Sequence, residues 1–176
     1  MLIRLCIVLT TCVISLSIVA CKQSGTEEPR NTNADAKPAA TPSNKFTAAD
    51  IAKLKWIEGT WRGMDGDKPF YERYKIEPTA MVVESLKDDG SPDGEPSRFE
   101  LKDGAFRSGE GDKRSAATEI TDTHIQFVPA PGSKGNNFRF EHQSDGTWIA
   151  LLEWPATADK PARQKIYKME PWQPKK

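Results

Sequence analysis

Pairs of an acidic residue and a glycine recur through this chain and divide it into short segments. The pairs are Asp65-Gly66, Asp89-Gly90, Asp93-Gly94, Asp103-Gly104, Glu110-Gly111 and Asp145-Gly146. Glycine adopts the positive φ angles that tight hairpin turns need, and an acidic residue before it favours the same turns. The segments between the pairs are rich in aromatic and β-branched residues, as strands are. The chain beyond Gly59 is therefore predicted to form strands joined by short turns.

Ten segments fit this description, and each carries one apolar face. They are residues 60–64, 70–77, 80–87, 97–102, 105–108, 114–121, 124–128, 137–143, 147–154 and 164–170. Phe138 and Phe140 share a face, for example, because alternate residues of a strand point the same way. Consecutive strands of this kind close most simply into a barrel, which also removes exposed strand edges. We therefore expect an all-β antiparallel meander barrel of about eight to ten strands, with a two-sheet sandwich as the alternative.

A short helix is predicted before the first strand. Thr47 is a good N-cap, and Asp50, three residues later, is placed to accept a hydrogen bond from its backbone amide. Ile51 and Leu54 share one face of such a helix. We expect the helix to end near Trp56.

The N-terminal residues have the form of an export signal. Arg4 precedes an apolar run that ends in small residues just before Cys21. The run is shorter and more polar than the roughly 20 apolar residues of a spanning helix. It resembles a bacterial lipoprotein signal, which implies cleavage after residue 20 and lipid on Cys21. An uncleaved N-terminal helix that contains a cysteine is the alternative.

This resemblance also implies a location in the bacterial cell envelope. Position 22 is Lys rather than the Asp that retains some lipoproteins in the inner membrane, so we expect the outer membrane, facing the periplasm. The remaining cysteines, Cys6 and Cys12, lie inside the apolar run. The chain after Cys21 has none, which excludes a disulfide or a cysteine metal site there.

Composition then divides the rest of the chain. Residues 21–45 combine the cysteine with a stretch that contains Pro29, Pro38 and Pro42 but no aromatic residue before position 46. Such a stretch buries too little apolar surface to fold, so it is predicted to be a flexible linker. Residues 46–172 are long enough for one domain, and residues 173–176 are expected to be a tail.

The charge balance argues against one class of partner. The chain has 25 basic and 25 acidic residues, and cleavage would remove only Arg4 from this balance. A net charge near zero provides no overall positive field to attract phosphates, so we expect no nucleic-acid partner. The membrane, through lipid on Cys21, is the expected partner, and the sequence does not define the oligomeric state.

Short motifs in a characteristic order suggest a family. They are Trp-Ile-Glu-Gly-Thr-Trp at 56–61, Phe-Tyr-Glu-Arg-Tyr at 70–74, Phe-Arg-Phe at 138–140, and Trp148. This order resembles a family of bacterial lipoproteins with a lipocalin-like (calycin) domain. The resemblance implies a barrel with Trp61 closing one end and a basic residue of the last strand packed over it. Arg163, Lys165 and Lys168 are the candidates. The family has no settled activity, so the resemblance implies none.

Several inward-facing residues are candidates for ligand binding: Trp61, Glu72, Tyr74, Phe138, His142 and Trp148. Glu72 shares its face with Phe70 and Tyr74, so either it orients or binds a basic ligand, or it pairs with an Arg or Lys or lies at an open barrel end. The two histidines lie 18 positions apart without a carboxylate motif, so we predict no metal site and no cofactor.

These observations favour a lipid-anchored module that binds a small, partly apolar molecule. The main alternative is a structural or protein-interaction lipoprotein with a filled barrel, which would use its outer face or the 87–97 loop. A hydrolase or isomerase using Glu72 and His142 is the third hypothesis. We predict that the protein is not an enzyme, because the sequence contains no nucleophile elbow, phosphate loop or His-Glu-x-x-His motif.

Overall fold

A computed structural model describes residues 45–174 of the chain, and the predicted signal peptide, Cys21 and almost all of the linker lie outside this range. The elements are α1 (Ala48–Ala52), the 3-10 helix η1 (Lys53–Ile57), β1 (Gly59–Asp65), β2 (Lys68–Glu77), β3 (Ala80–Leu86), β4 (Ser97–Lys102), β5 (Ala105–Ser108), the 3-10 helix η2 (Gly111–Lys113), β6 (Ser115–Ile120), β7 (His124–Pro129), β8 (Asn137–His142), β9 (Trp148–Trp154) and β10 (Arg163–Pro171). All ten predicted strands are present, with ends within about two residues of those expected.

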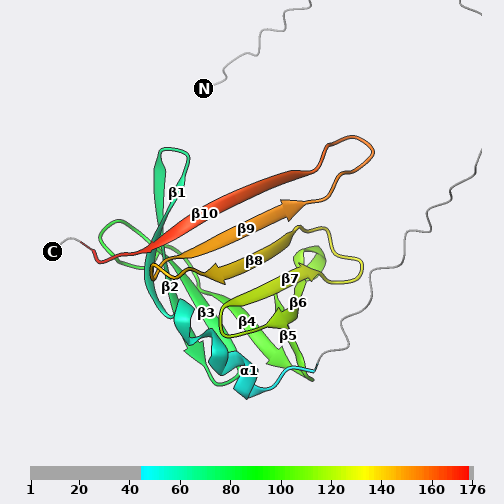
Figure 1. The fold of residues 1–176 in the computed structure, drawn as a ribbon, viewed down its shortest axis with the longest axis horizontal. Coiled ribbons are helices and arrows are strands. Elements are labelled where there is room, and N and C mark those ends of the chain that lie inside the picture. The colour runs from blue at the N-terminus through cyan, green and yellow to red at the C-terminus, as the bar shows by residue number, and fades with distance from the viewer. Residues whose placement is uncertain (1–44, 175–176) are drawn as a thin grey trace, which may run out of the picture. The chain divides into compact units, whose positions relative to one another are not determined.

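The ten strands form one closed antiparallel barrel (Figure 1). Each strand pairs with the next along the chain, and β1 pairs with β10 to complete the ring, with Trp61 opposite Pro171. The predicted meander barrel is therefore confirmed, and the sandwich alternative is wrong. Short turns produce this order because a two-residue hairpin connects only neighbouring antiparallel strands.

The ladders around the ring differ in length. β2 and β3 pair along seven residues, from Tyr71 opposite Leu86 to Glu77 opposite Ala80. In contrast, β5 and β6 share two residue pairs, and β1 and β10 share two. The wall at β5 and β6 therefore has few of the backbone hydrogen bonds that hold a sheet together.

The predicted helix is present, but it changes form partway along. The carboxylate of Asp50 accepts hydrogen bonds of 2.9 Å from both the backbone amide and the hydroxyl of Thr47, as the capping prediction requires. The α-helix ends at Ala52, and the chain continues as a 3-10 helix to Ile57. The sequence predicted one helix ending near Trp56. The end of the helical segment was therefore nearly correct, but the change from α-helix to 3-10 helix was not predicted.

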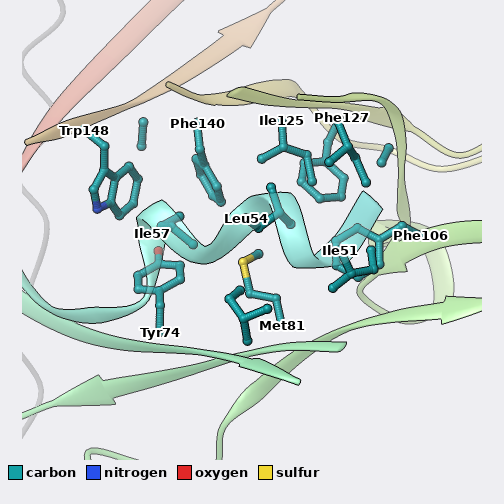
Figure 2. Close-up of a cluster of buried hydrophobic side chains, with 14 of the residues drawn as sticks. Ile51, Leu54, Ile57, Tyr74, Met81, Phe106, Ile125, Phe127, Phe140 and Trp148 are labelled. Atoms are coloured by element: carbon teal, nitrogen blue, oxygen red, sulfur yellow. The ribbon is translucent and has the colours of Figure 1, made fainter. Parts of the chain in front are cut away.

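This helical segment lies across the barrel and fills part of its interior (Figure 2). Ile51, Leu54 and Ile57 are completely buried. Figure 2 shows them between side chains of β7–β9 on one side and of β2 and β3 on the other, including Trp148 and Met81. Burial of a large aliphatic side chain stabilises a fold by about 1.5–3 kcal/mol, so these three residues anchor the segment firmly.

A glycine on β1 allows a tight contact inside the wall. A Cβ atom at Gly63 would overlap the ring of Phe70 and would lie 2.8 Å from the sulfur of Met169. The Phe70 ring fills this space and packs edge-on against Tyr167, with centroids 5.2 Å apart. Gly63 therefore allows β2 and β10 to pack their side chains together across β1.

Candidate functional site

One end of the barrel interior is solid. Trp61 and Trp148 lie there with 6% and 0% of their surfaces exposed, and their rings meet edge-on at 6.0 Å. The indole nitrogen of Trp61 donates a 2.8 Å hydrogen bond to the carbonyl oxygen of Ile57. Both tryptophans therefore pack within the core next to the helical segment, and neither lines the cavity described below.

The interior is hollow beyond this core. A cavity of about 790 Å³, partly open to solvent, is lined on its inner side by side chains of β2, β3, β4, β5 and β8. These are Glu72, Tyr74, Val83, Ser97, Phe99, Ser108 and Phe140. The register explains the set, because Tyr74 lies opposite Val83, Val83 opposite Ser97, and Phe99 opposite Ser108. Partners directly across an antiparallel ladder point to the same face.

Aromatic rings form much of the apolar wall of this cavity. Phe99 and Phe140 both belong to a continuous cluster of rings that also contains Phe106, Phe127 and Phe138. Phe127 and Phe138 stack with centroids 4.5 Å apart. Phe138, which was expected to contact a ligand, thus supports the wall and is not one of the cavity-lining residues.

The cavity contains one acidic side chain on an inward-facing position, that of Glu72. The hydroxyl of Tyr74 donates a 2.8 Å hydrogen bond to its carboxylate. Within residues 45–174, no Lys, Arg or His lies within ion-pair distance of Glu72. Of the alternatives for Glu72, pairing with an Arg or Lys is therefore wrong, and its partner is a neutral donor two residues along the same strand.

Burial controls the protonation of this pair. Desolvation raises the pKa of Glu72, and the hydrogen bond from Tyr74 opposes that rise. Desolvation also raises the pKa of Tyr74 well above its ordinary value, and the neighbouring Glu72 charge adds to the effect. Tyr74 is 4% exposed and packs edge-on against Phe140 and Trp148, so its hydroxyl remains a protonated donor with a fixed direction.

The mouth of the cavity carries charges of both signs on the outward-facing positions of β4 and β5. Arg98 pairs with Glu77 at 2.9 Å and with Glu100 at 3.2 Å, which neutralises its charge. Lys102 and Arg107 also border the cavity, and no ion pair joins either one to another part of the described chain. The entrance is thus polar, and the apolar surface lies deeper.

His142 is separated from this group. Its ring stacks on that of Trp56 at the end of the helical segment, with centroids 5.6 Å apart. It is not one of the cavity-lining residues, and no hydrogen bond or ion pair in the described structure joins it to Glu72. The structure therefore does not bring together the two residues of the hydrolase or isomerase hypothesis.

None of the three basic candidates on the last strand packs over Trp61. Arg163 lies over the ring of Trp154 at 4.2 Å, and Lys165 lies over Tyr167 at 4.9 Å. Lys168 instead forms a 3.1 Å ion pair with Asp145.

Sequence reasoning missed Val83, Phe99, Phe140 and two serines of the cavity wall. Phe140 shares a strand face with Phe138, so the alternation of residues along the strand could have identified Phe140 as a lining residue. The others depend on which residues of β3, β4 and β5 lie opposite one another, and several different registers fit the sequence equally well.

Two kinds of feature are absent from residues 45–174. No group of three or more His, Cys, Asp or Glu side chains is placed to hold a metal ion. None of the helices in residues 45–174 is long and apolar enough to cross a membrane.

Comparison of the chain with models of known protein families and with curated proteins finds no match.

Proposed function

We propose that this protein is a lipid-anchored envelope module that binds a small, partly apolar molecule in the barrel cavity. The observation that carries the proposal is the cavity of about 790 Å³, which extends from the charged mouth to an inner wall that includes Tyr74, Val83, Phe99 and Phe140. Small-molecule sites have volumes of about 300–1,000 Å³ and combine apolar walls with a few polar groups. Glu72, Ser97 and Ser108 provide such polar groups here.

The division of the interior supports binding over a purely structural role. A filled barrel was the alternative. The helical segment fills the interior from Trp148 across to Phe106 and leaves the cavity beside Glu72 open. A protein-interaction surface would present a large apolar patch to solvent. Large hydrophobic side chains exposed within residues 45–174 are limited to Met64 and Ile166, so no specific observation favours that second function.

A search for a bound molecule tests the binding function. The full chain, purified from its own host, is expected to show an added small-molecule mass in native mass spectrometry. Ser108→Trp should remove the added mass, because the indole would project into the cavity. Ser144→Trp is the matched control on an exposed turn and should retain it. Identical spectra for the wild type and Ser108→Trp would contradict binding in this cavity.

The attachment to the membrane is tested separately. We propose that lipid on Cys21 holds the protein in the outer membrane, facing the periplasm, on the basis of the signal-like sequence at the N-terminus. Metabolic labelling with a fatty-acid analogue should label the wild type and Cys12→Ser but not Cys21→Ser. Labelling of Cys21→Ser, or its absence from the wild type, would refute lipid attachment at this residue.

A further inference from the structure

We propose that the molecule bound in this cavity carries a cationic head, such as a protonated amine, which the carboxylate of Glu72 binds directly. This inference rests on the proposed binding function and adds the chemical class of the ligand. It is carried by three features: the fixed carboxylate, the missing basic partner, and the aromatic wall beside them.

The position of the carboxylate is set by its neighbour. Tyr74 is almost completely buried, and its ring is held between Phe140, at 6.4 Å and 87°, and Trp148, at 5.3 Å and 83°. Its hydroxyl donates to Glu72 at 2.8 Å. A phenol has one proton to donate, whereas a carboxylate has about four lone-pair positions. Most of the acceptor capacity of Glu72 therefore remains available to a ligand.

The carboxylate also has an unbalanced charge. On the outer face of the same strand, Arg73 contacts Glu84 at 2.9 Å. Glu72 has only the neutral Tyr74. Burying a carboxylate without a cation is costly, and desolvation raises the pKa of Glu72 accordingly. A cationic ligand would supply the missing charge at the position where it is most stabilising.

The surrounding side chains suit the rest of such a molecule. Phe99 and Phe140 line the same cavity as Glu72, so their rings are available to an apolar body attached to the cation. Ring faces also attract cations. The basic residues at the mouth, Lys102 and Arg107, occupy the outward-facing positions of β4 and β5, since the inward positions are taken by Leu101 and Phe106.

Three nearly isosteric probes with different heads test this inference on the purified full chain. The probes are 2-phenylethylammonium, 2-phenylethanol and 3-phenylpropanoate, with dissociation constants measured by titration calorimetry. The ammonium pairs its own charge with the carboxylate, whereas the alcohol offers only a neutral donor, so the ammonium should bind about tenfold more tightly than the alcohol. The carboxylate probe should bind most weakly, because like charges repel.

Two variants assign the preference to one residue. Glu72→Gln keeps the size and removes the charge, so it should bring the affinity for the ammonium to that for the alcohol. Glu84→Gln, on the outward face of β3, is the matched control and should keep the wild-type ranking. Circular dichroism establishes that each variant is folded. If Glu72→Gln does not fold, the affinities of the wild type for the three probes still test whether the cavity prefers a cationic head.

The outcomes separate the two proposals. Equal binding of ammonium and alcohol by the wild type, or an ammonium preference that persists in Glu72→Gln, would overturn the cationic head and leave cavity binding intact. Tightest binding of the alcohol would also overturn the cationic head and leave cavity binding intact. That result would indicate that a protonated Glu72 donates a hydrogen bond to neutral ligands. Binding of none of the probes would contradict the binding function together with this inference.

Discussion

The indole nitrogen of Trp61 reaches back four residues to the carbonyl oxygen of Ile57, at 2.8 Å. This hydrogen bond joins the first strand to the last residue of the helical segment, where a carbonyl would otherwise lack a partner. Ile57 is completely buried and Trp61 nearly so, so water does not replace the bond easily. This hydrogen bond explains why tryptophan suits position 61 better than a large apolar residue without a donor.

Trp61→Phe should therefore destabilise the fold. The substitution leaves the buried carbonyl of Ile57 without a donor, which costs about 1–3 kcal/mol. Urea unfolding followed by circular dichroism measures the loss. Trp172→Phe is the control, because the half-buried Trp172 ring packs against Tyr71 at a centroid distance of 4.1 Å, and phenylalanine keeps a ring there. Equal stability of Trp61→Phe and the wild type would show that this hydrogen bond contributes little.

Gly63→Ala should destabilise the barrel through overpacking. The added methyl group would overlap Phe70 and would lie 2.8 Å from the sulfur of Met169. Extra atoms in a well-packed core typically cost about 1–3 kcal/mol. Gly135→Ala is the matched control, because its methyl group would lie at ordinary distance, 3.5 Å from Pro129. Thermal unfolding of both variants tests the contrast, and similar melting temperatures would contradict it.

The cap of α1 predicts a specific acid sensitivity. The hydrogen bond to Lys53 and then that to the Thr47 amide lower the pKa of Asp50 from 3.8 to about 2. A carboxyl whose pKa is lower in the folded state stabilises the fold above pH 3.8, and this contribution is lost as the pH falls toward 2. The stability difference between the wild type and Asp50→Asn should therefore shrink across this window.

Chemical unfolding at several pH values between 5 and 2 measures that difference. Asp159→Asn provides the comparison, because no hydrogen bond or ion pair joins the Asp159 side chain to the rest of the described structure. Its difference from the wild type should stay flat across the window. A difference for Asp50→Asn that is equally flat would refute the role assigned to the cap.

Hydrogen exchange should locate the softest part of the barrel wall at β5. The ladder between β5 and β6 has two residue pairs, whereas that between β2 and β3 has seven. Short ladders open at lower free energy, so amides of Ala105–Ser108 should exchange faster than those in the middle of β2. Ser108 lines the cavity, so this opening would occur in the cavity wall. Equal protection of the two strands would contradict the prediction.

Most of the fold was predictable because its signals are local. Each acidic-glycine pair marks a turn within a few residues, and alternation such as that of Phe138 and Phe140 identifies the inner face without reference to other strands. The capping pair Thr47 and Asp50 is equally local. The transition to a 3-10 helix after Ala52 was missed, since it reflects how the segment packs against the barrel.

The site was less predictable because it depends on contacts between distant segments. Trp61, Tyr74 and Trp148 were recognised as inward-facing, but only Tyr74 lines the cavity. Whether an aromatic ring fills the core or faces a cavity depends on where the helical segment ends inside the barrel. Glu72 was expected to have a basic partner if it had any, and its partner is the neighbouring Tyr74.

The pairing of β1 with β10 affects how neighbouring copies of this protein can associate. Unpaired backbone amides along an outer strand can recruit the same strand of a second copy and start a growing fibril. In this ring, the first and last strands pair with one another at two positions, Trp61 with Pro171 and Arg62 with Glu170. Copies that collide therefore find this part of both edges already occupied, so a strand cannot be added there.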